Sequence, residues 1–507
     1  MFADEELDSV EFKSTWKKER SLKSSSAQTS EILTDEVEVQ SIHRVNVRIQ
    51  TEEEPEKSFH IGHDESKELQ EFLQRVEPFV SKQLDKNIRS HAFDGYEVNW
   101  REDAHAVTCI HTLSHAALDG ELQCTGLSWN STGSVVAVAF GRFDHQDWCT
   151  HKSMLCTWNV DRTLNAHKPV AAIDLSSCLM CIAFHPKKPA IIAGGNFNGE
   201  IVIWDLSRED ETIVATSGIG DDSHREPVSK LRWIEDPSSK GKKYNIVSVS
   251  SDGKILIWQV NRRKGSLELA EGFVLLTESM PRDLKRKARL GGNTEMGVTC
   301  ISYAHEDKSL FVVGSESGGV FKCSMNARGS AAGANIQSSV PLRSPVTFSF
   351  QPHHGPVYAV DCSPYHRNLL LSCGTDTTAR IYSMLQDKPV LSIEPGLGYL
   401  FAAKWSPVRP LVFAVVTGEG LLLIYDLKTS KINPVYTLQA GTDKEPVFTL
   451  EFNQNQLGNN ENRNERQLLA TGDGAGVVRV WQLSDELTTQ GAREIESLAD
   501  IAASALD

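Results

Sequence analysis

A few acidic, histidine and cysteine residues of this chain have the types that catalysis or metal binding needs. Asp221 and Asp222 precede His224, a grouping that could supply a general acid, a general base or metal ligands. Cys178 and Cys181 form a Cys-x-x-Cys pair, but a structural metal site needs a second pair of ligands, and none is near in the sequence. We find no phosphate loop, no Gly-x-Ser-x-Gly, no His-Glu-x-x-His and no other Cys/His metal spacing. We therefore predict no catalytic residue, no metal and no cofactor, and we assign the ten cysteines to a reduced core.

The elements that position most of these residues are expected to be short strands. After residue 100 apolar and polar residues alternate, which is the period of a β-strand. The segment 191–206 reads IIAGGNFNGEIVIWDL, which predicts two strands joined by an Asn-Gly turn of type I′. The unit occurs seven times, each time after another short strand. One residue of each hairpin occupies an equivalent place: Trp158, Trp204, Trp258, Cys323, Tyr382, Tyr425 and Trp481.

Repeats of this kind are typical of the WD40 β-propeller, so we predict an all-β fold with seven blades. WD40 repeats carry a histidine that binds an aspartate of the following hairpin turn. We predict two such pairs, His224 with Asp252 and His354 with Asp376. Each bond would tie an outer loop of a blade to its hairpin turn, so we assign these residues a structural role rather than a catalytic one.

The seventh hairpin lacks a fourth strand after it. Residues 104–112, AHAVTCIHT, alternate weakly and are predicted to supply that strand, which closes the ring and removes an exposed sheet edge. Three long segments, 262–297, 326–345 and 454–466, are predicted to be solvated insertions.

The N-terminal fifth of the chain has a different composition. Residues 1–103 hold 24 acidic and 14 basic residues, a net charge of −10 out of −15 for the chain. Residues 1–65 have too few apolar side chains to offset chain entropy and are predicted to be disordered. The segment 66–88 is predicted to be an amphipathic helix that Pro78 kinks or splits. Its apolar face consists of Leu69, Phe72, Leu73, Val76, Val80 and Leu84.

The helix has two open interpretations: its apolar face packs on the chain's own core, or it binds a partner.

We divide the chain into an arm (1–65), a helix (66–89), a linker (90–103), a propeller (104–485) and a C-terminal tail (486–507). Because the chain has a net negative charge, we expect no general attraction to nucleic acid or anionic lipid. No apolar run approaches the roughly 20 residues that cross a bilayer, so we predict no membrane insertion.

Four functions are open for such a propeller: an enzyme, a substrate receptor of a ubiquitin ligase, a coat scaffold, and a motor subunit. Ligase receptors often carry Trp-Asp-x-Arg at the end of a hairpin. The segments 158–162, WNVDR, and 204–208, WDLSR, place the arginine one position late, which disfavours that function.

Four stretches resemble the WD-repeat intermediate chains of dynein motors, above all those of dynein-2, the motor of retrograde intraflagellar transport. They are SHAFDGYEVNW (90–100), SWNSTGSVVAVAFGRFDHQDW (128–148), SSVPLRSP (338–345) and WSPVRPLVFA (405–414). The resemblance implies a non-catalytic subunit whose propeller binds the dynein-2 heavy chain. It also implies an arm that recruits dimeric light chains, which pair the subunit with a second intermediate chain. The implied location is the cytoplasm, the cytoskeleton and the cilium, including the axoneme and basal body region, and the implied role includes cilium assembly.

The resemblance also assigns roles to short segments of the arm. Eight-kilodalton dynein light chains bind extended peptides as an added edge strand, with Gln-Thr as the anchor. Two segments fit, although neither has the Thr before Gln of the stronger form; they are Ala27, Gln28 and Thr29, and Ile49, Gln50 and Thr51. The helix 66–88 matches the family's site for the roadblock-type light-chain dimer. Tctex-type light chains and intraflagellar transport trains are further implied partners.

Overall fold

The computed structural model describes residues 65–88, 107–115, 122–145, 148–161, 166–208, 211–236, 239, 241, 243–279, 294–330, 338–454 and 467–503. The chain divides into two units, Met1–Val98 and Asn99–Asp507. The two Gln-Thr segments of the arm lie outside the described residues.

Helix α1 (Glu65–Ile88) is the described element of the first unit. Pro78 lies inside it and does not split it, so of the two predicted alternatives, a kink or a split, the split is wrong. The proline ring removes one backbone hydrogen-bond donor, and the other turns of a 24-residue helix remain to hold the segment together. Among the described helices, none is long and apolar enough to cross a membrane.

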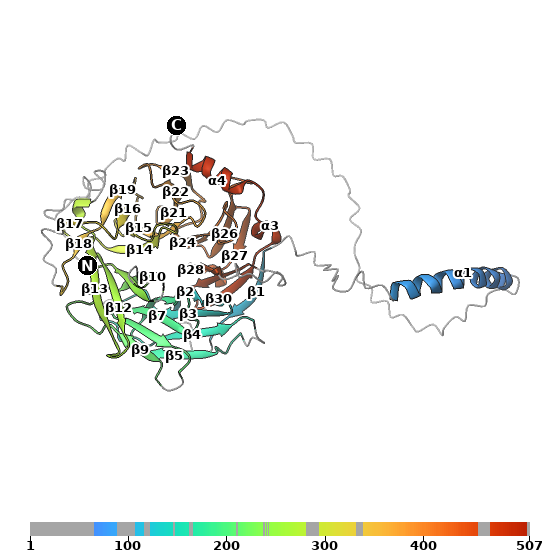
Figure 1. The fold of residues 1–507 in the computed structure, drawn as a ribbon, viewed down its shortest axis with the longest axis horizontal. Helices are drawn as coiled ribbons and strands as arrows, with labels where there is room; N and C mark the ends of the chain where they lie inside the picture. The colour runs from blue at the N-terminus through green and yellow to red at the C-terminus, as the bar shows by residue number, and fades with distance from the viewer. Residues whose placement is uncertain are drawn as a thin grey trace, which may run out of the picture. The chain divides into compact units, whose positions relative to one another are not determined.

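The described strands of the second unit form antiparallel sheets of four strands, arranged as seven blades around a ring (Figure 1). Two neighbouring blades are joined into one larger sheet by a single bridge between Thr216 and Ser266. The first strands of the blades contact one another and line the centre of the ring. They are β2 (Gln123–Trp129), β6 (Leu179–Phe184), β10 (Val228–Glu235), β14 (Val298–Tyr303), β20 (Val357–Cys362), β24 (Leu400–Trp405) and β28 (Val447–Phe452).

The second strands form hairpins with the third strands. The second strands are β3 (Val135–Gly141), β7 (Ile191–Asn196), β11 (Tyr244–Ser250), β15 (Leu310–Ser315), β21 (Leu369–Gly374), β25 (Val412–Thr417) and β29 (Leu468–Asp473). The third strands are β4 (Ser153–Asn159), β8 (Ile201–Asp205), β12 (Lys254–Asn261), β16 (Val320–Ser324), β22 (Ala379–Ser383), β26 (Leu421–Asp426) and β30 (Val478–Gln482).

The fourth strands form the rim of the ring. They are β5 (Ala171–Leu175), β9 (Ile213–Thr216), β13 (Ser266–Val274), β19 (Val346–Ser349), β23 (Pro389–Ile393), β27 (Tyr436–Gln439) and β1 (Thr108–Leu113). The short strands β17 (Gly329–Ser330) and β18 (Arg343–Ser344) join β13 from outside. Second strands such as β7 are buried along their whole length, because neighbouring blades cover both faces, whereas rim strands such as β5 are more exposed.

Strand β1 closes the ring, as the segment 104–112 was predicted to do. It pairs antiparallel with β30, from Thr108 opposite Gln482 to Leu113 opposite Val478, and lies beside it in Figure 1. The prediction for 262–297 was wrong in part, because that segment contains the rim strand β13, whose Phe273 is fully buried. This strand was assigned to a loop in the sequence analysis because the segment around it is rich in charged residues.

The hairpin turns also differ from the prediction. In the turn of IIAGGNFNGEIVIWDL, Gly199 has a φ of +83° but Asn198 does not have a positive φ, so the turn is not of type I′. The Gly199 N–H donates to the carbonyl of Asn196, as in a type I turn that ends in a left-handed glycine. Thr377 takes the equivalent position in the β21–β22 turn, with a φ of +61°.

The segment after residue 485, predicted as a tail, is folded onto the blades. It contains helices α3 (Asp485–Thr488) and α4 (Glu494–Ala503). Leu498 and Ala502 of α4 are buried in the apolar cluster of the blades that contain β21 and β25. Leu487 of α3 is buried with Leu483 in the neighbouring cluster.

Candidate functional site

The histidine of the third blade stands in a chain of buried hydrogen bonds. His224 Nδ1 lies 3.2 Å from the Asp252 carboxylate, as predicted, and His224 Nε2 lies 2.7 Å from the hydroxyl of Ser248. The Trp258 indole N–H donates to the same hydroxyl at 2.9 Å. Burial alone would favour the protonated acid, but His224 and two backbone N–H groups hold the pKa of Asp252 below its ordinary value. Ser248 is the member of this network that the sequence analysis missed.

The hydrogen bonds run from Ser248 to His224 to Asp252, as they do in a Ser–His–Asp catalytic triad. The surroundings of these residues nevertheless exclude that chemistry. Ser248 is fully buried and His224 is 1% exposed, so no substrate carbonyl can reach the hydroxyl. The hydroxyl is also engaged by the indole N–H of Trp258. The network therefore fastens the outer loop to the hairpin.

The second pair was misassigned by one residue. His353, not His354, contacts Asp376, with Nδ1 2.9 Å from the carboxylate and Nε2 2.7 Å from the hydroxyl of Ser372. His354 is exposed and contributes only its backbone N–H to Asp376. Burial lowers the pKa of His353, although the bond to Asp376 opposes this shift.

The spacing to the following strand could have corrected this error. His224 lies four residues before Val228, where β10 begins, and the residue four before Val357, where β20 begins, is His353. The distance in sequence to the following strand therefore determines which histidine side chain enters the blade. Whether a glycine follows the histidine does not determine it.

The seven equivalent hairpin residues all lie on the third strands and are 0–5% exposed. Their polar atoms are not all satisfied: Trp481 donates to Thr471, but Trp158 and Trp204 have no partner for the indole N–H among the described residues. The common property of the position is therefore burial.

Asp221 and Asp222 do not join His224 in a site. Asp222 accepts hydrogen bonds from the backbone N–H of Ser339 at 2.6 Å and from the hydroxyl of Ser338. The backbone and side-chain donors of Ser339 lower the pKa of the Asp222 carboxyl despite its partial burial. The grouping therefore anchors the 338–339 segment instead of forming an acid–base pair with the histidine.

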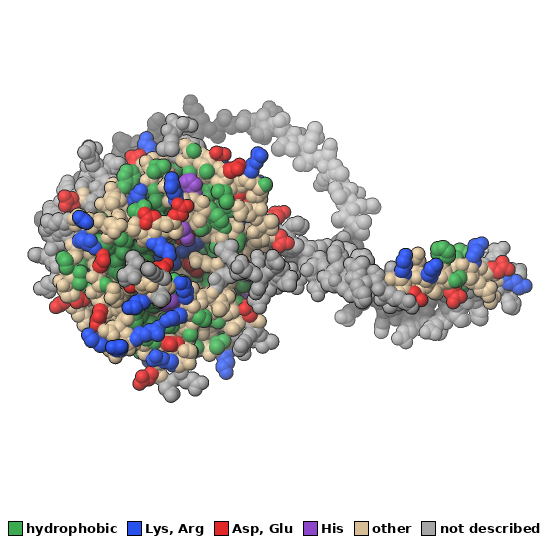
Figure 2. All heavy atoms as spheres, viewed as in Figure 1, with side chains coloured by type: hydrophobic (Ala, Val, Ile, Leu, Met, Phe, Trp, Pro, Cys, Tyr) green, Lys and Arg blue, Asp and Glu red, His purple; other side chains and the backbone are tan. Residues whose placement is uncertain are grey.

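Apolar side chains project from α1. Five of the six predicted residues are between 41% and 55% exposed, and they are Leu69, Phe72, Leu73, Val80 and Leu84. Phe79, which the periodicity analysis omitted, is 74% exposed and lies seven residues after Phe72, so it widens the same face. Figure 2 shows apolar side chains along this helix and a mixture of acidic, basic and apolar side chains on the visible face of the ring.

A cavity of about 600 Å³ opens at the mouth of the central channel. Its wall includes residues from the first strands of the blades and four aromatic rings in series. Phe143 packs against Phe448, Phe448 against Phe401, and Phe401 against Tyr358, with ring centroids 4.9, 5.0 and 5.2 Å apart. Partly exposed aromatic side chains of this kind are suited to binding a partner protein.

One cluster of cysteine and histidine residues was not recognised in the sequence analysis. His145, Cys149 and His151, all in the β3–β4 loop, have side-chain donor atoms within 4.8 Å of one another. Cys178 and Cys181 are buried free thiols, and burial raises the pKa of each to about 12. The spacing His-x-x-x-Cys-x-His was not recognised because it lacks paired Cys-x-x-Cys or His-x-x-x-His ligands.

Seven four-stranded blades, a closing strand from the N-terminal side and the buried His–Asp pairs define a WD40-repeat propeller. The chain matches the family Dynein axonemal intermediate chain 3 WD40 domain over residues 148–269, and the WD domain, G-beta repeat, over residues 344–383.

Relatives match nearly the whole chain. It is 44% identical to cytoplasmic dynein 2 intermediate chain 2 of Mus musculus over 99% of this chain and 92% of the relative. It is 47% identical to the Homo sapiens protein of the same name over 86% of this chain and 79% of the relative. Dynein axonemal intermediate chain 2 of Homo sapiens is 28% identical over 72% of this chain and 53% of the relative. The chain belongs to the family of WD-repeat dynein intermediate chains, and the predicted resemblance and fold class are confirmed.

Proposed function

We propose that this chain is a non-catalytic intermediate chain of cytoplasmic dynein 2, which serves retrograde intraflagellar transport and cilium assembly. The observation that carries the proposal is the 44% identity to a mouse dynein 2 intermediate chain over 99% of this chain. The buried state of the Ser248, His224 and Asp252 network supports a scaffold role rather than catalysis. The proposed locations are the cytoplasm, the cytoskeleton and the cilium, including its axoneme and basal body region.

The propeller is the proposed binding site for the dynein-2 heavy chain. A propeller offers a large rigid surface, and the aromatic residues at the channel mouth give it an apolar region for such a contact. The arm and α1 are the proposed sites for the light chains and, through them, for the second intermediate chain. Tctex-type light chains and intraflagellar transport trains are further proposed partners.

Helix α1 is the proposed site for a roadblock-type light-chain dimer. An amphipathic helix binds by laying its apolar face into a groove of the partner. Leu69, Phe72, Leu73, Val76, Val80 and Leu84 would form that face, with Phe79 at its edge.

The two Gln-Thr segments are the proposed sites for eight-kilodalton light chains. Gln28 and Thr29, and Gln50 and Thr51, would anchor an added strand, and two weak sites on one chain can bind a light-chain dimer tightly through linked binding. Calorimetry with peptides 22–34 and 44–56 measures each site alone. Changing all four anchor residues to Ala should abolish binding, whereas a matched variant with Glu52, Glu53 and Glu54 changed to Gln should retain it.

Affinity purification of the tagged full-length chain from ciliated cells, followed by mass spectrometry, tests the proposed function. We expect a dynein heavy chain, a second intermediate chain and light chains. The four-residue Gln-Thr variant should retain the heavy chain while losing eight-kilodalton light chains. Recovery of cullin-ligase adaptors or coat subunits in place of a dynein heavy chain would contradict the proposal.

A further inference from the structure

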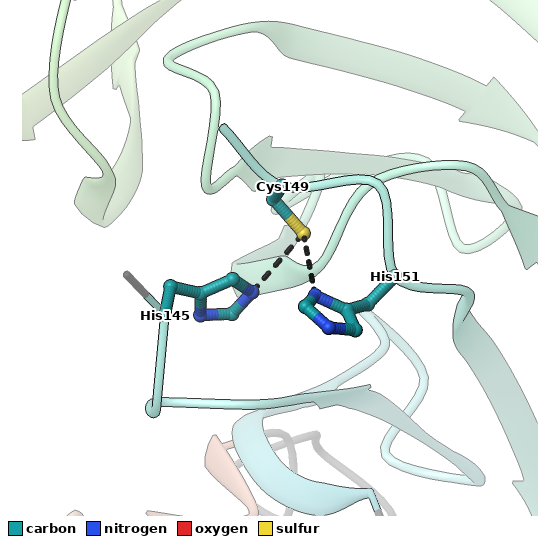
Figure 3. A group of neighbouring side chains, drawn as sticks. All are labelled: His145, Cys149 and His151. Atoms are coloured by element: carbon teal, nitrogen blue, oxygen red, sulfur yellow. Dashed lines mark hydrogen bonds between the residues drawn. The ribbon is translucent and has the colours of Figure 1, made fainter. Parts of the chain in front are cut away.

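The β3–β4 loop brings two imidazoles and one thiol to a common point. Cys149 Sγ lies 3.1 Å from His145 Nε2 and 3.9 Å from His151 Nδ1, and both rings turn these atoms toward the sulfur (Figure 3). Cys149 is 1% exposed, whereas His151 lies at the surface. The cluster is therefore a buried thiol with a solvent-facing side.

Simple hydrogen bonding accounts for only part of this arrangement. A thiol has one proton, so Cys149 can donate to only one of the two imidazoles. The sulfur also accepts a hydrogen bond from the backbone N–H of Cys178 at 3.2 Å. The thiolate is the form of cysteine that binds metal ions.

The backbone around the thiol is held from a neighbouring blade. Asn198, in the β7–β8 turn, accepts a hydrogen bond from the N–H of Cys149 and donates one to its carbonyl, each at 3.0 Å. The ring of His145 stacks on Phe197 of the same turn, with the centroids 3.9 Å apart. These contacts fix two of the three donor atoms before any ion binds, as outer contacts do in known metal sites.

The two separations between sulfur and nitrogen are compatible with a tetrahedral ion. With Zn–S near 2.3 Å and Zn–N near 2.0–2.1 Å, sulfur and nitrogen ligands of one tetrahedral zinc ion lie roughly 3.6 Å apart. The two separations, 3.1 and 3.9 Å, fall on either side of this value. One thiolate with two imidazoles suits zinc, and three protein ligands leave a fourth coordination position open.

We propose that His145, Cys149 and His151 bind a zinc ion. The ion would join the start and the end of the β3–β4 loop, and through Asn198 the loop would be fixed to the second blade. The same loop carries Phe143, whose ring packs on Phe448 at the channel mouth. Zinc would thus order one side of the aromatic cavity. The site is independent of the proposed role in dynein 2.

Metal analysis of the full-length chain, purified without chelators and in the presence of a reductant, tests the proposal. We expect about one zinc ion per chain in the wild type, and loss of that ion in Cys149→Ser and in the double variant His145→Gln, His151→Gln. Cys109→Ser and His354→Gln change exposed residues outside the cluster and are the matched controls, which should retain zinc. Asn198→Ala should weaken zinc binding roughly tenfold, since it removes an outer contact.

Cobalt substitution supplies a second readout. A tetrahedral site with one thiolate gives intense visible bands and a sulfur-to-cobalt charge-transfer band, and the charge-transfer band should vanish in Cys149→Ser. If that variant does not fold, His151→Gln, at an exposed position, should still lower the zinc affinity. A wild-type chain that neither contains zinc nor binds added zinc, or that binds copper but not zinc, would overturn the proposal.

Discussion

A buried ion pair fastens the C-terminal segment to the propeller. Arg409, in the loop after β24, donates to Glu494 at the start of α4, with Nη2 2.7 Å and Nε 3.0 Å from Oε1. The same guanidinium lies 3.0 Å from Asp426 of β26. The side chains of Arg409, Glu494 and Asp426 are 6%, 1% and 7% exposed. Water therefore has little access to these groups, and it compensates only weakly for an ion pair that a substitution removes.

The change Glu494→Gln should lower the free energy of unfolding by about 3 kcal/mol, the low end for losing one partner of a buried pair, because Asp426 still pairs with Arg409. With an unfolding entropy of roughly 2.1 cal/mol/K per residue over about 400 residues, this lowers Tm by about 4 °C. Arg409→Met should cost more than Glu494→Gln, because it leaves Asp426 and Glu494 as neighbouring buried carboxylates without their cation. The double variant Arg409→Met, Glu494→Met should lose less than the sum of the single changes.

Differential scanning calorimetry and urea unfolding of the full-length chain at neutral pH measure these changes. Glu496→Gln is the matched control, because Glu496 lies on the same helix and its pair with Arg493 is 76–84% exposed. That change should shift the free energy of unfolding by less than about 1 kcal/mol. If Glu494→Gln is as mild as Glu496→Gln, the C-terminal helix does not unfold together with the blades and the argument fails.

Three further predictions follow from other parts of the chain. Changing Phe72 and Leu73 to Asp should weaken roadblock-type light-chain binding at least 100-fold, since each buried side chain contributes about 1.5–3 kcal/mol; calorimetric titration measures this, and a lower propeller Tm would instead mean that α1 packs on its own chain. Thr377→Gly should raise the free energy of unfolding by about 0.5–1 kcal/mol, because it removes a branched residue from a φ of +61°, and Thr377→Ala, measured in the same urea series, should lie between the two. Burial lowers the pKa of His185 from 6.5 to about 4, so the unfolded chain binds more protons between these values and stability should fall as the pH drops through this range. Scanning calorimetry of His185→Gln should show a weaker pH dependence, and an unchanged slope would contradict this assignment.

The blades could be predicted from the sequence because their signals are local. Period-two alternation and the hairpin turns lie within about 16 residues, and an isolated hairpin already contains the information for its register. The turn type was missed because Asn-Gly is compatible with two geometries. The choice depends on Asn198, which needs a positive φ in a type I′ turn and does not have one here, whereas Gly199 is left-handed at φ +83°.

The C-terminal helices could not be predicted in the same way, because the contacts that stabilise them are distant in sequence. The segment 494–503 has an apolar face, but nothing near it indicates that Leu498 packs with residues such as Leu411 and Leu427. Glu494 is an acidic residue in an acidic region, and its buried role appears only once Arg409, 85 residues away, is placed beside it. Polar residues whose function is to join distant segments carry no periodic signal.

The aromatic position of the repeat shows how packing and hydrogen bonding separate. Trp204 and Trp258 occupy equivalent places and both are buried, but only Trp258 has a serine partner for its indole N–H. Leaving a buried donor without a partner costs about 1–3 kcal/mol, so the indole of Trp204 is retained for the volume it fills between the blades. Cys323 fills the same place with much less volume, where Phe321 of its own strand packs into the same cluster. The position is thus defined by the space between neighbouring blades, and the His–Ser–Asp network is added where a loop must be held.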